Sequence, residues 1–105
     1  MTSEKRKSPR YAFFASVEIT ERLTGVHLTG RTSELSLHGC YFDMMNPLLP
    51  GSIVTIRIQN HDETFEAEGH VIYSQTNRGM GVAFDEVGVS DQLILEGWLS
   101  KLLGS

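Results

Sequence analysis

The sequence predicts a small all-β domain, an antiparallel barrel or sandwich, that ends in one helix. Apolar and polar residues alternate with a period of two in six short segments between residues 12 and 85, and this alternation is typical of half-buried strands. Glycine, proline, asparagine and aspartate gather between the segments, as they do in turns. Beyond residue 90 the apolar spacing changes to three and four residues, which favours an amphipathic helix.

Six strands are expected in order along the chain. They are 12–20, 26–34, 40–45, 52–59, 64–74 and 80–85. Strict alternation in the fifth of these segments would place Tyr73 on the same face as Val71. Closure of the strands into a barrel is attractive because a barrel leaves no exposed strand edge.

The expected helix covers residues 90–103. Ser90 and Asp91 provide a plausible N-terminal cap, and Gly104 provides a C-terminal stop. Trp98 lies on the apolar stripe of this segment, among leucine and isoleucine side chains. A helix of this kind most often packs on its own barrel, although the Trp98 face is also suited to a partner.

Length and composition indicate one domain, residues 1–105, with a core of its own. A chain of 105 residues buries roughly two thirds of its extended surface on folding. The single cysteine, Cys40, cannot form an internal disulfide, which favours a reducing setting. The chain has no apolar run of the roughly 18 residues that span a bilayer, nor the apolar stretch of a signal peptide. We therefore expect a cytoplasmic protein that does not insert into a membrane.

Charge is divided unevenly along the chain. Residues 1–10 hold four basic and one acidic side chains, a local charge of +3, within a total of −4. The other 95 residues hold five basic and twelve acidic side chains, a charge of −7. An acidic body repels nucleic acid, whose binding depends on many phosphate contacts, so we expect no nucleic-acid partner. A short basic arm suits a small ligand with one or two phosphates.

The sequence lacks metal-binding and catalytic patterns. No two of the four histidines have the spacing that brings ligands onto one ion, and His38 with Cys40 would supply at most two ligands. Ser36 lacks the Gly-x-Ser-x-Gly surroundings of a hydrolase nucleophile, and no two carboxylates have the spacing of a matched acid and base. We expect no metal site, no catalytic residue and no enzymatic activity.

Two arginines four residues apart precede the first expected strand. Arg6 and Arg10 flank the segment Lys7-Ser8-Pro9, and the proline excludes a helix interior, so the arginines sit on an irregular arm. The planar guanidinium fork of arginine can grip phosphate oxygens, or guanine O6 and N7, with two hydrogen bonds at once.

A second polar pattern, Glu34-Leu35-Ser36-Leu37-His38-Gly39, closes the second expected strand. In an extended segment, side chains two residues apart point the same way, so Glu34 and Ser36 would form one edge. That edge could meet a base, with the carboxylate accepting from guanine N1–H and N2–H. Gly39 permits a left-handed turn or a close backbone approach.

The two patterns together, in this order, resemble the PilZ domain, a bacterial receptor module for cyclic di-GMP. Arg6 and Arg10 match the family's Arg-x-x-x-Arg motif, and Ser36 and Gly39 match its Asp/Asn-x-Ser-x-x-Gly motif, in which Glu34 replaces the Asp or Asn. The resemblance continues through segments 49–54, 68–72 and 79–84 and covers residues 6 to about 103.

This resemblance implies a six-stranded antiparallel barrel over residues 12–85, a ligand-binding arm over residues 1–11 and a C-terminal helix. The implied ligand is cyclic di-GMP, with no other cofactor. The implied site residues are Lys5, Arg6, Arg10, Glu34, Ser36 and Gly39. Ligand binding would order the arm and pass a signal to a protein partner, for example in motility, polysaccharide synthesis or regulation.

Two other functions stay open on the sequence. A PilZ-like adaptor that binds no nucleotide would act through protein contacts, and the replacement at Glu34 favours it mildly while the two arginines disfavour it. A single-stranded nucleic-acid binder would use the arm together with Tyr11, Phe13 and Phe14 for stacking, and the acidic body disfavours it.

Overall fold

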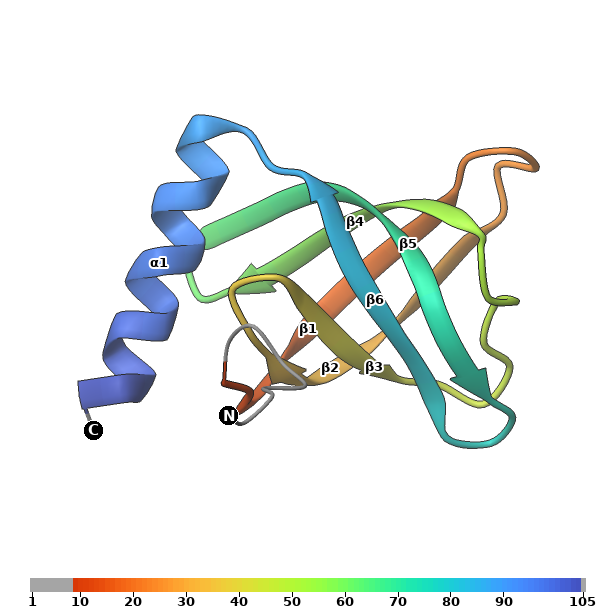
Figure 1. Ribbon diagram of the computed structural model, residues 1–105, viewed down its shortest axis with the longest axis horizontal. Helices are drawn as coiled ribbons and strands as arrows, with labels where there is room; N and C mark the ends of the chain where they lie inside the picture. Colours follow the sequence, from red (N-terminus) through yellow and green to blue (C-terminus); the bar gives the residue numbers. More distant parts are fainter. Residues whose placement is uncertain (1–8, 105) are drawn as a thin grey trace, which may run out of the picture.

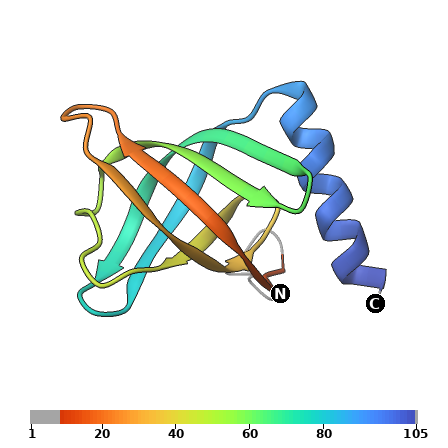
Figure 2. The ribbon, with the colours of Figure 1, turned by 180° about the vertical axis from the view of Figure 1, so that it is seen from behind.

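The computed structural model describes residues 9–104, which form six strands and one helix (Figures 1 and 2). The elements are β1 (Tyr11–Glu21), β2 (His27–Leu35), β3 (Gly39–Asp43), β4 (Ile53–Asn60), β5 (Glu63–Gln75), β6 (Gly79–Glu86) and α1 (Val89–Gly104). All six expected strands are present, with ends shifted by one or two residues. The predicted all-β fold with a C-terminal helix is confirmed.

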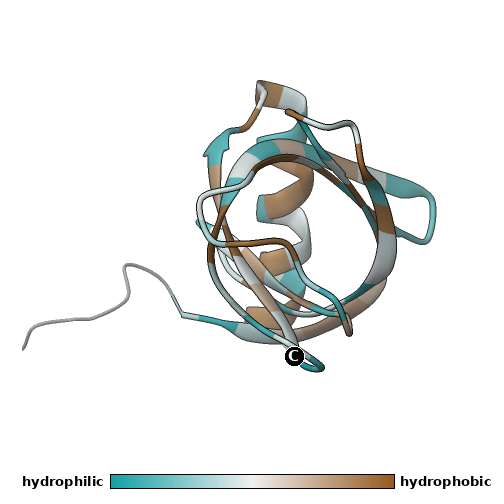
Figure 3. Ribbon diagram, turned by 90° about the vertical axis from the view of Figure 1, so that its right-hand side faces the viewer, coloured by the Kyte–Doolittle hydropathy of each residue, from teal (hydrophilic) through white to brown (hydrophobic). Residues whose placement is uncertain are grey.

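The strands form a closed barrel in the order β1-β2-β3-β6-β5-β4, and every neighbouring pair is antiparallel. Pairing of β1 with β4 completes the ring, which is visible when the barrel is viewed from the end away from α1 (Figure 3). Of the two architectures that the alternation allowed, the barrel is therefore the one adopted.

The interior of the barrel is filled by the inward-facing residues of the alternating segments. The largest fully buried side chains of the strands are Val17, Ile19, Leu35, Phe42, Val54, Ile56, Ile58, Phe65, Val71, Met80 and Val82. Burial of these side chains supplies the main stabilising free energy of the fold, because each contributes about 1.5–3 kcal/mol relative to full exposure.

Helix α1 covers one end of the barrel (Figure 1), and Trp98 is its central contact. The Trp98 ring stacks on Phe13 with centroids 5.2 Å apart and lies 6.3 Å from the ring of Phe65. Its indole N–H donates to Glu63 Oε1 at 2.7 Å, so the one polar atom of this buried ring is paired. The Trp98 face thus packs on the barrel of the same chain. No helix within residues 9–104 is long and apolar enough to cross a bilayer.

The expected cap at Ser90 and Asp91 is wrong, because α1 begins at Val89. The amide of Gln92 donates to the carbonyl of Gly88 at 2.9 Å, so the first helical hydrogen bond starts before the expected cap. The carboxylate of Asp91 instead accepts from the backbone amide of Glu66 on β5 at 2.8 Å. Asp91 therefore ties the helix to the barrel.

The expectation that Tyr73 shares a face with Val71 is also wrong. The register between β5 and β6 shifts between these two residues, which leaves Ile72 as an extra residue on β5. A bulge of this kind resets the alternation, and Ile72 and Tyr73 are consequently 53% and 42% exposed. Tyr73 thus lies on the outer surface, whereas Val71 is buried.

Gly39 is required by a close approach between strands. A Cβ atom at this position would lie well inside contact distance of the backbone carbonyl of Val82 on β6, whereas a Cβ at Gly97 in the helix would meet no atom within 4 Å. Gly39 is not among the positive-φ glycines of the described chain. Of the two reasons that the sequence allowed for this glycine, the close approach is the one that applies.

We predict opposite effects of alanine at these two glycines. Gly39→Ala should lower the free energy of unfolding by about 2 kcal/mol, because the β3–β6 backbone must move apart. Gly97→Ala should raise it by about 0.5–1 kcal/mol, because alanine favours a helix more than glycine does. Urea unfolding followed by circular dichroism measures both effects. A Gly39→Ala protein as stable as the wild type would contradict the assignment.

We also predict that Trp98 is the main anchor of α1. Trp98→Ala should lower the free energy of unfolding by about 3–5 kcal/mol. Trp98→Phe should lower it by about 1 kcal/mol, because phenylalanine keeps a smaller aromatic ring against Phe13 but loses the bond to Glu63. Leu93→Ala, on the same helix but 65% exposed, should change stability by less than about 0.5 kcal/mol. Equal losses for the Trp98 and Leu93 variants, measured by urea unfolding, would show that the stack is not the anchor.

Candidate functional site

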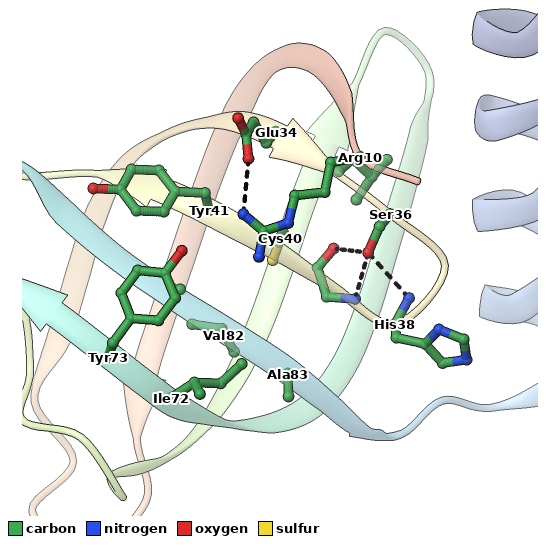
Figure 4. Close-up of a pocket in the computed structure, with 13 residues that line it drawn as sticks. Arg10, Glu34, Ser36, His38, Cys40, Tyr41, Ile72, Tyr73, Val82 and Ala83 are labelled. Carbon is green, nitrogen blue, oxygen red and sulfur yellow. Dashed lines mark hydrogen bonds and ion pairs between the residues drawn. The ribbon is translucent and has the colours of Figure 1, made fainter. Parts of the chain in front are cut away.

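A cavity of about 200 Å³ lies on the outer surface of the barrel beside the turn between β2 and β3. We call it the β2–β3 cavity, and its lining is Arg10, Glu34, Leu35, Ser36, His38, Gly39, Cys40, Tyr41, Ile72, Tyr73, Gly81, Val82 and Ala83 (Figure 4). Pockets that enclose a drug-sized ligand usually exceed about 300 Å³. A larger ligand would therefore lie partly across the barrel surface.

Four of the residues expected from the sequence line this cavity. Arg10 enters from the segment just before β1, and Glu34 lies near the end of β2. Ser36 lies in the turn that follows, and Gly39 is the first residue of β3. The other two expected residues, Lys5 and Arg6, lie outside the described residues.

Arg10 and Glu34 form an ion pair at the cavity (Figure 4). Arg10 Nη1 and Glu34 Oε1 are 3.5 Å apart, and the two side chains are 38% and 45% exposed. The contact is looser than the pair of Arg22 with Glu68 on the same barrel, which is 2.9 Å long. Exposed ion pairs contribute only about 0–1 kcal/mol to the stability of a protein. The guanidinium group and the carboxylate can therefore exchange partners at low cost.

The hydroxyl group of Ser36 is used inside its own turn. Its Oγ accepts from the backbone amides of His38 and Gly39 at 3.3 and 3.1 Å, and donates to the carbonyl of Gly39 at 3.2 Å. A hydroxyl has one donor and two acceptor sites, so this turn uses its full capacity. Glu34 instead faces Arg10. The side chains of Glu34 and Ser36 therefore do not form the shared edge that the alternation predicted.

The outward position of Glu34 depends on a β-bulge. The register between β2 and β3 shifts between Thr32 and Glu34, so that Ser33 is an extra residue on β2. Thr32 and Leu35 are therefore both buried although they are three residues apart, and Glu34 between them stays on the outer surface.

Two tyrosines that were not among the site residues expected from the sequence form an aromatic surface in the cavity. The rings of Tyr41 on β3 and Tyr73 on β5 have centroids 6.1 Å apart, and both residues pair in register with Gly81 on β6. A Cβ atom at Gly81 would lie 2.6 Å from the Tyr73 ring, so glycine makes room for that ring. The Gly-x-Gly pattern of residues 79–81 is the only sequence signal for this arrangement.

Ionisation of two cavity residues is suppressed by burial. Burial, with smaller contributions from Tyr73 and Asp43, raises the pKa of Tyr41, so its phenol stays protonated and can donate a hydrogen bond. Burial also raises the pKa of the Cys40 thiol well above its ordinary value. The thiolate is the nucleophilic form of cysteine, so Cys40 is a buried apolar group in this cavity.

The arrangement is suited to binding. It offers a guanidinium group, a carboxylate and two aromatic rings on one outer surface. Across residues 9–104, no three His, Cys, Asp or Glu side chains are placed to hold a metal ion.

Comparisons with known proteins agree on the fold. The Bacillus subtilis inhibitor of motility MotI/DgrA superposes with a TM-score of 0.77 at 16% identity, covering 98% of this chain and 54% of that protein. The PilZ domain of Escherichia coli YcgR with c-di-GMP gives 0.76 at 16% identity, covering 94% and 92%. The PilZ domain of CeSA from a cellulose-synthesizing bacterium gives 0.69 at 21% identity, covering 92% and 97%.

Because these identities are low, the structural likeness establishes only the fold, a six-stranded barrel with a C-terminal helix. This chain spans about half the length of MotI/DgrA. A search of curated proteins found no match. The family model described as PilZ domain, however, matches residues 4–101. The chain therefore belongs to the PilZ domain family.

Proposed function

We propose that this protein is a bacterial cyclic di-GMP receptor that binds its ligand at the β2–β3 cavity. The observation that carries the proposal is the convergence of three kinds of group on one cavity. Arg10 suits a phosphate, Glu34 suits the N–H edge of guanine, and the Tyr41–Tyr73 surface suits the face of a base. Membership of the PilZ family, and the c-di-GMP-bound structure of its member YcgR, support the choice of ligand.

Arg10 contributes the guanidinium fork for a ligand phosphate or for guanine O6 and N7. Arg6 completes the pair on the N-terminal arm, and Lys5 adds a point charge for a second phosphate contact. The two phosphates attract the basic arm only when the ligand is bound. Ligand binding therefore orders the arm in a position where it contacts the phosphates. That shift is the signal we assign to this domain.

Ser36 and Gly39 contribute to binding by shaping the turn. The hydroxyl of Ser36 closes the turn, and the missing side chain of Gly39 lets β3 approach β6. Glu34 then carries the reading of the guanine edge alone, since the Ser36 hydroxyl has no unused capacity.

The proposed activity is recognition without chemistry on the ligand. The Ser36 hydroxyl is engaged in its turn and the Cys40 thiol is buried and protonated, so neither serves as a nucleophile. The signal would pass to a protein partner in the bacterial cytoplasm, of the kind that controls motility, polysaccharide synthesis or gene regulation.

A nucleotide-independent adaptor is the second candidate function. The ion pair of Arg10 with Glu34 favours it, because a carboxylate already occupies the arginine that a phosphate would need. Recovery of one protein partner from a lysate, equally with and without added cyclic di-GMP, would favour this candidate over the receptor.

We predict that Arg10→Ala weakens cyclic di-GMP binding more than tenfold, because truncation of a charged contact costs about 2–5 kcal/mol. Isothermal titration calorimetry measures the dissociation constant and the molar ratio. The matched control is Arg22→Ala, since Arg22 also pairs with a glutamate on this barrel but lies outside the cavity. Equal affinities for the two variants would remove Arg10 from the site, and no binding by the wild-type protein would reject the receptor.

We further predict that Tyr73→Ala weakens binding about fivefold or more, because stacking of a base on an aromatic ring contributes about 1–3 kcal/mol. Phe14→Ala is the control, since Phe14 is a 61% exposed aromatic residue that does not line the cavity. Gly81→Ala should weaken binding as well, because the added methyl group displaces the Tyr73 ring. Undiminished affinity in Tyr73→Ala would show that the ligand does not use this ring.

A further inference from the structure

We propose that the outer face of α1 is the interface of a homodimer, in which the α1 helices of two copies lie parallel and side by side. We call this surface the outer α1 face, and its residues, all exposed, are Val89, Leu93, Glu96, Gly97, Ser100, Lys101 and Leu103. None of them lines the β2–β3 cavity. The inference therefore goes beyond the proposed function and does not depend on the ligand.

Helix α1 carries apolar side chains on two opposite sides. Trp98 is buried against the barrel, whereas Val89, Leu93 and Leu103 are 82%, 65% and 71% exposed. At 3.6 residues per turn, these three residues lie about 140–180° around the helix axis from Trp98. A surface helix of a globular protein usually has one apolar side that faces the core and a polar opposite side. The second apolar side of α1 contributes little to the fold of a single chain and is suited to burial against another surface.

The outer α1 face is accessible to a second copy. The helix lies at one end of the barrel, and no other element of the described chain covers the side of the helix that faces away from the barrel (Figures 1 and 2). A Cβ atom at Gly97 would meet no other part of residues 9–104 within 4 Å, and Ser100 is exposed beside it. These two small residues let the backbone of a second helix come close. The two barrels would then lie on the outer sides of the helix pair.

Charge favours a second copy as the occupant of this face. The 95 residues that follow the basic arm carry a charge of −7, so most of the surface of one copy repels another. The outer α1 face, in contrast, holds one acidic and one basic residue, Glu96 and Lys101, and has no net charge. Neither residue forms an ion pair with another of the described residues. Each copy therefore brings the counter-charge that the other copy lacks.

The spacing of the two charges determines the direction of the helix pair. Leu93, Gly97 and Ser100 follow one another at steps of four and three residues, as the seam positions of a coiled coil do. Glu96 and Lys101 lie on the two flanks of this seam. In a parallel pair, flanking residues that face each other across the seam are about five positions apart in sequence, which is the separation of Glu96 and Lys101. Each Glu96 then faces Lys101 of the second copy, and two identical ion pairs form about a twofold axis.

The interface between two α1 helices is small. The helix has 16 residues and is therefore about 24 Å long. A single pair of such helices lies at the low end of the areas found in specific interfaces. We therefore expect a reversible dimer that is populated at high protein concentration, in which each copy keeps its own β2–β3 cavity.

The first test is sedimentation equilibrium of the full chain from micromolar to millimolar concentration. The wild type should show a monomer–dimer equilibrium, and Leu93→Glu should abolish the dimer because it places two carboxylates in the apolar seam. Leu23→Glu is the matched control, since Leu23 is an even more exposed leucine in the turn between β1 and β2, at the other end of the barrel (Figure 1). It should leave the dimer unchanged. Circular dichroism checks that both variants fold.

An exchange of charges tests the parallel arrangement. Glu96→Lys and Lys101→Glu should each weaken dimerisation about tenfold, because two attractive ion pairs become two repulsive ones. The double variant Glu96→Lys/Lys101→Glu should dimerise as the wild type does, since the exchange restores both pairs. This variant has the same net charge as the wild type, so its comparison with the wild type is free of a general charge effect.

Each outcome decides the inference without touching the proposed function. A wild type that stays monomeric at every concentration overturns the dimer, and so does a dimer that persists in Leu93→Glu or that Leu23→Glu weakens equally. A double variant that dimerises as poorly as the two single variants overturns the pairing of Glu96 with Lys101. Titration of cyclic di-GMP judges the receptor separately, because no residue of the outer α1 face lines the cavity.

Discussion

The candidate site depends on one non-local interaction, the backbone pairing of β3 with β6. Five register pairs join Gly39–Asp43 to Ala83–Gly79, and an additional bond from the amide of Phe84 to the carbonyl of His38 extends the contact into the turn. This pairing brings the β2–β3 turn against the strand that carries Gly81. Without it, the Tyr41–Tyr73 surface and Gly81 would not share a cavity with Arg10, whose place beside Glu34 comes from the pairing of β1 with β2.

Much of the fold follows from period-two alternation, and its errors have local causes. Alternation locates all six strands, because the face on which Val54, Ile56 or Ile58 lies is determined by the position of each residue along its own strand. It misplaces Tyr73 because the extra residue Ile72 enters through pairing with β6, which is remote in sequence. A bulge leaves no signal in a single alternating segment, so its position could not be predicted from composition or period.

The sequence indicated four residues that line the candidate cavity but only part of how their side chains are arranged. Arg10, Glu34, Ser36 and Gly39 are brought to one cavity, as the resemblance to the PilZ domain implied. The engagement of the Ser36 hydroxyl could not be deduced, because it depends on backbone amides positioned by the turn. The position of Tyr41 and Tyr73 in the cavity was equally hidden, since these residues meet across a glycine on a third strand.

Residues of one motif can therefore be required for two different physical reasons. Ser36 and Gly39 use their hydrogen-bonding capacity and their small size within the fold, so truncating them would disturb the turn whether or not a ligand touches them. Arg10 and Glu34 keep exposed, weakly held charges that can change partners. A lost affinity is thus informative about direct ligand contact at Arg10 or Glu34, where stability hardly depends on the side chain. At Ser36 or Gly39 the same loss reports first on the shape of the turn.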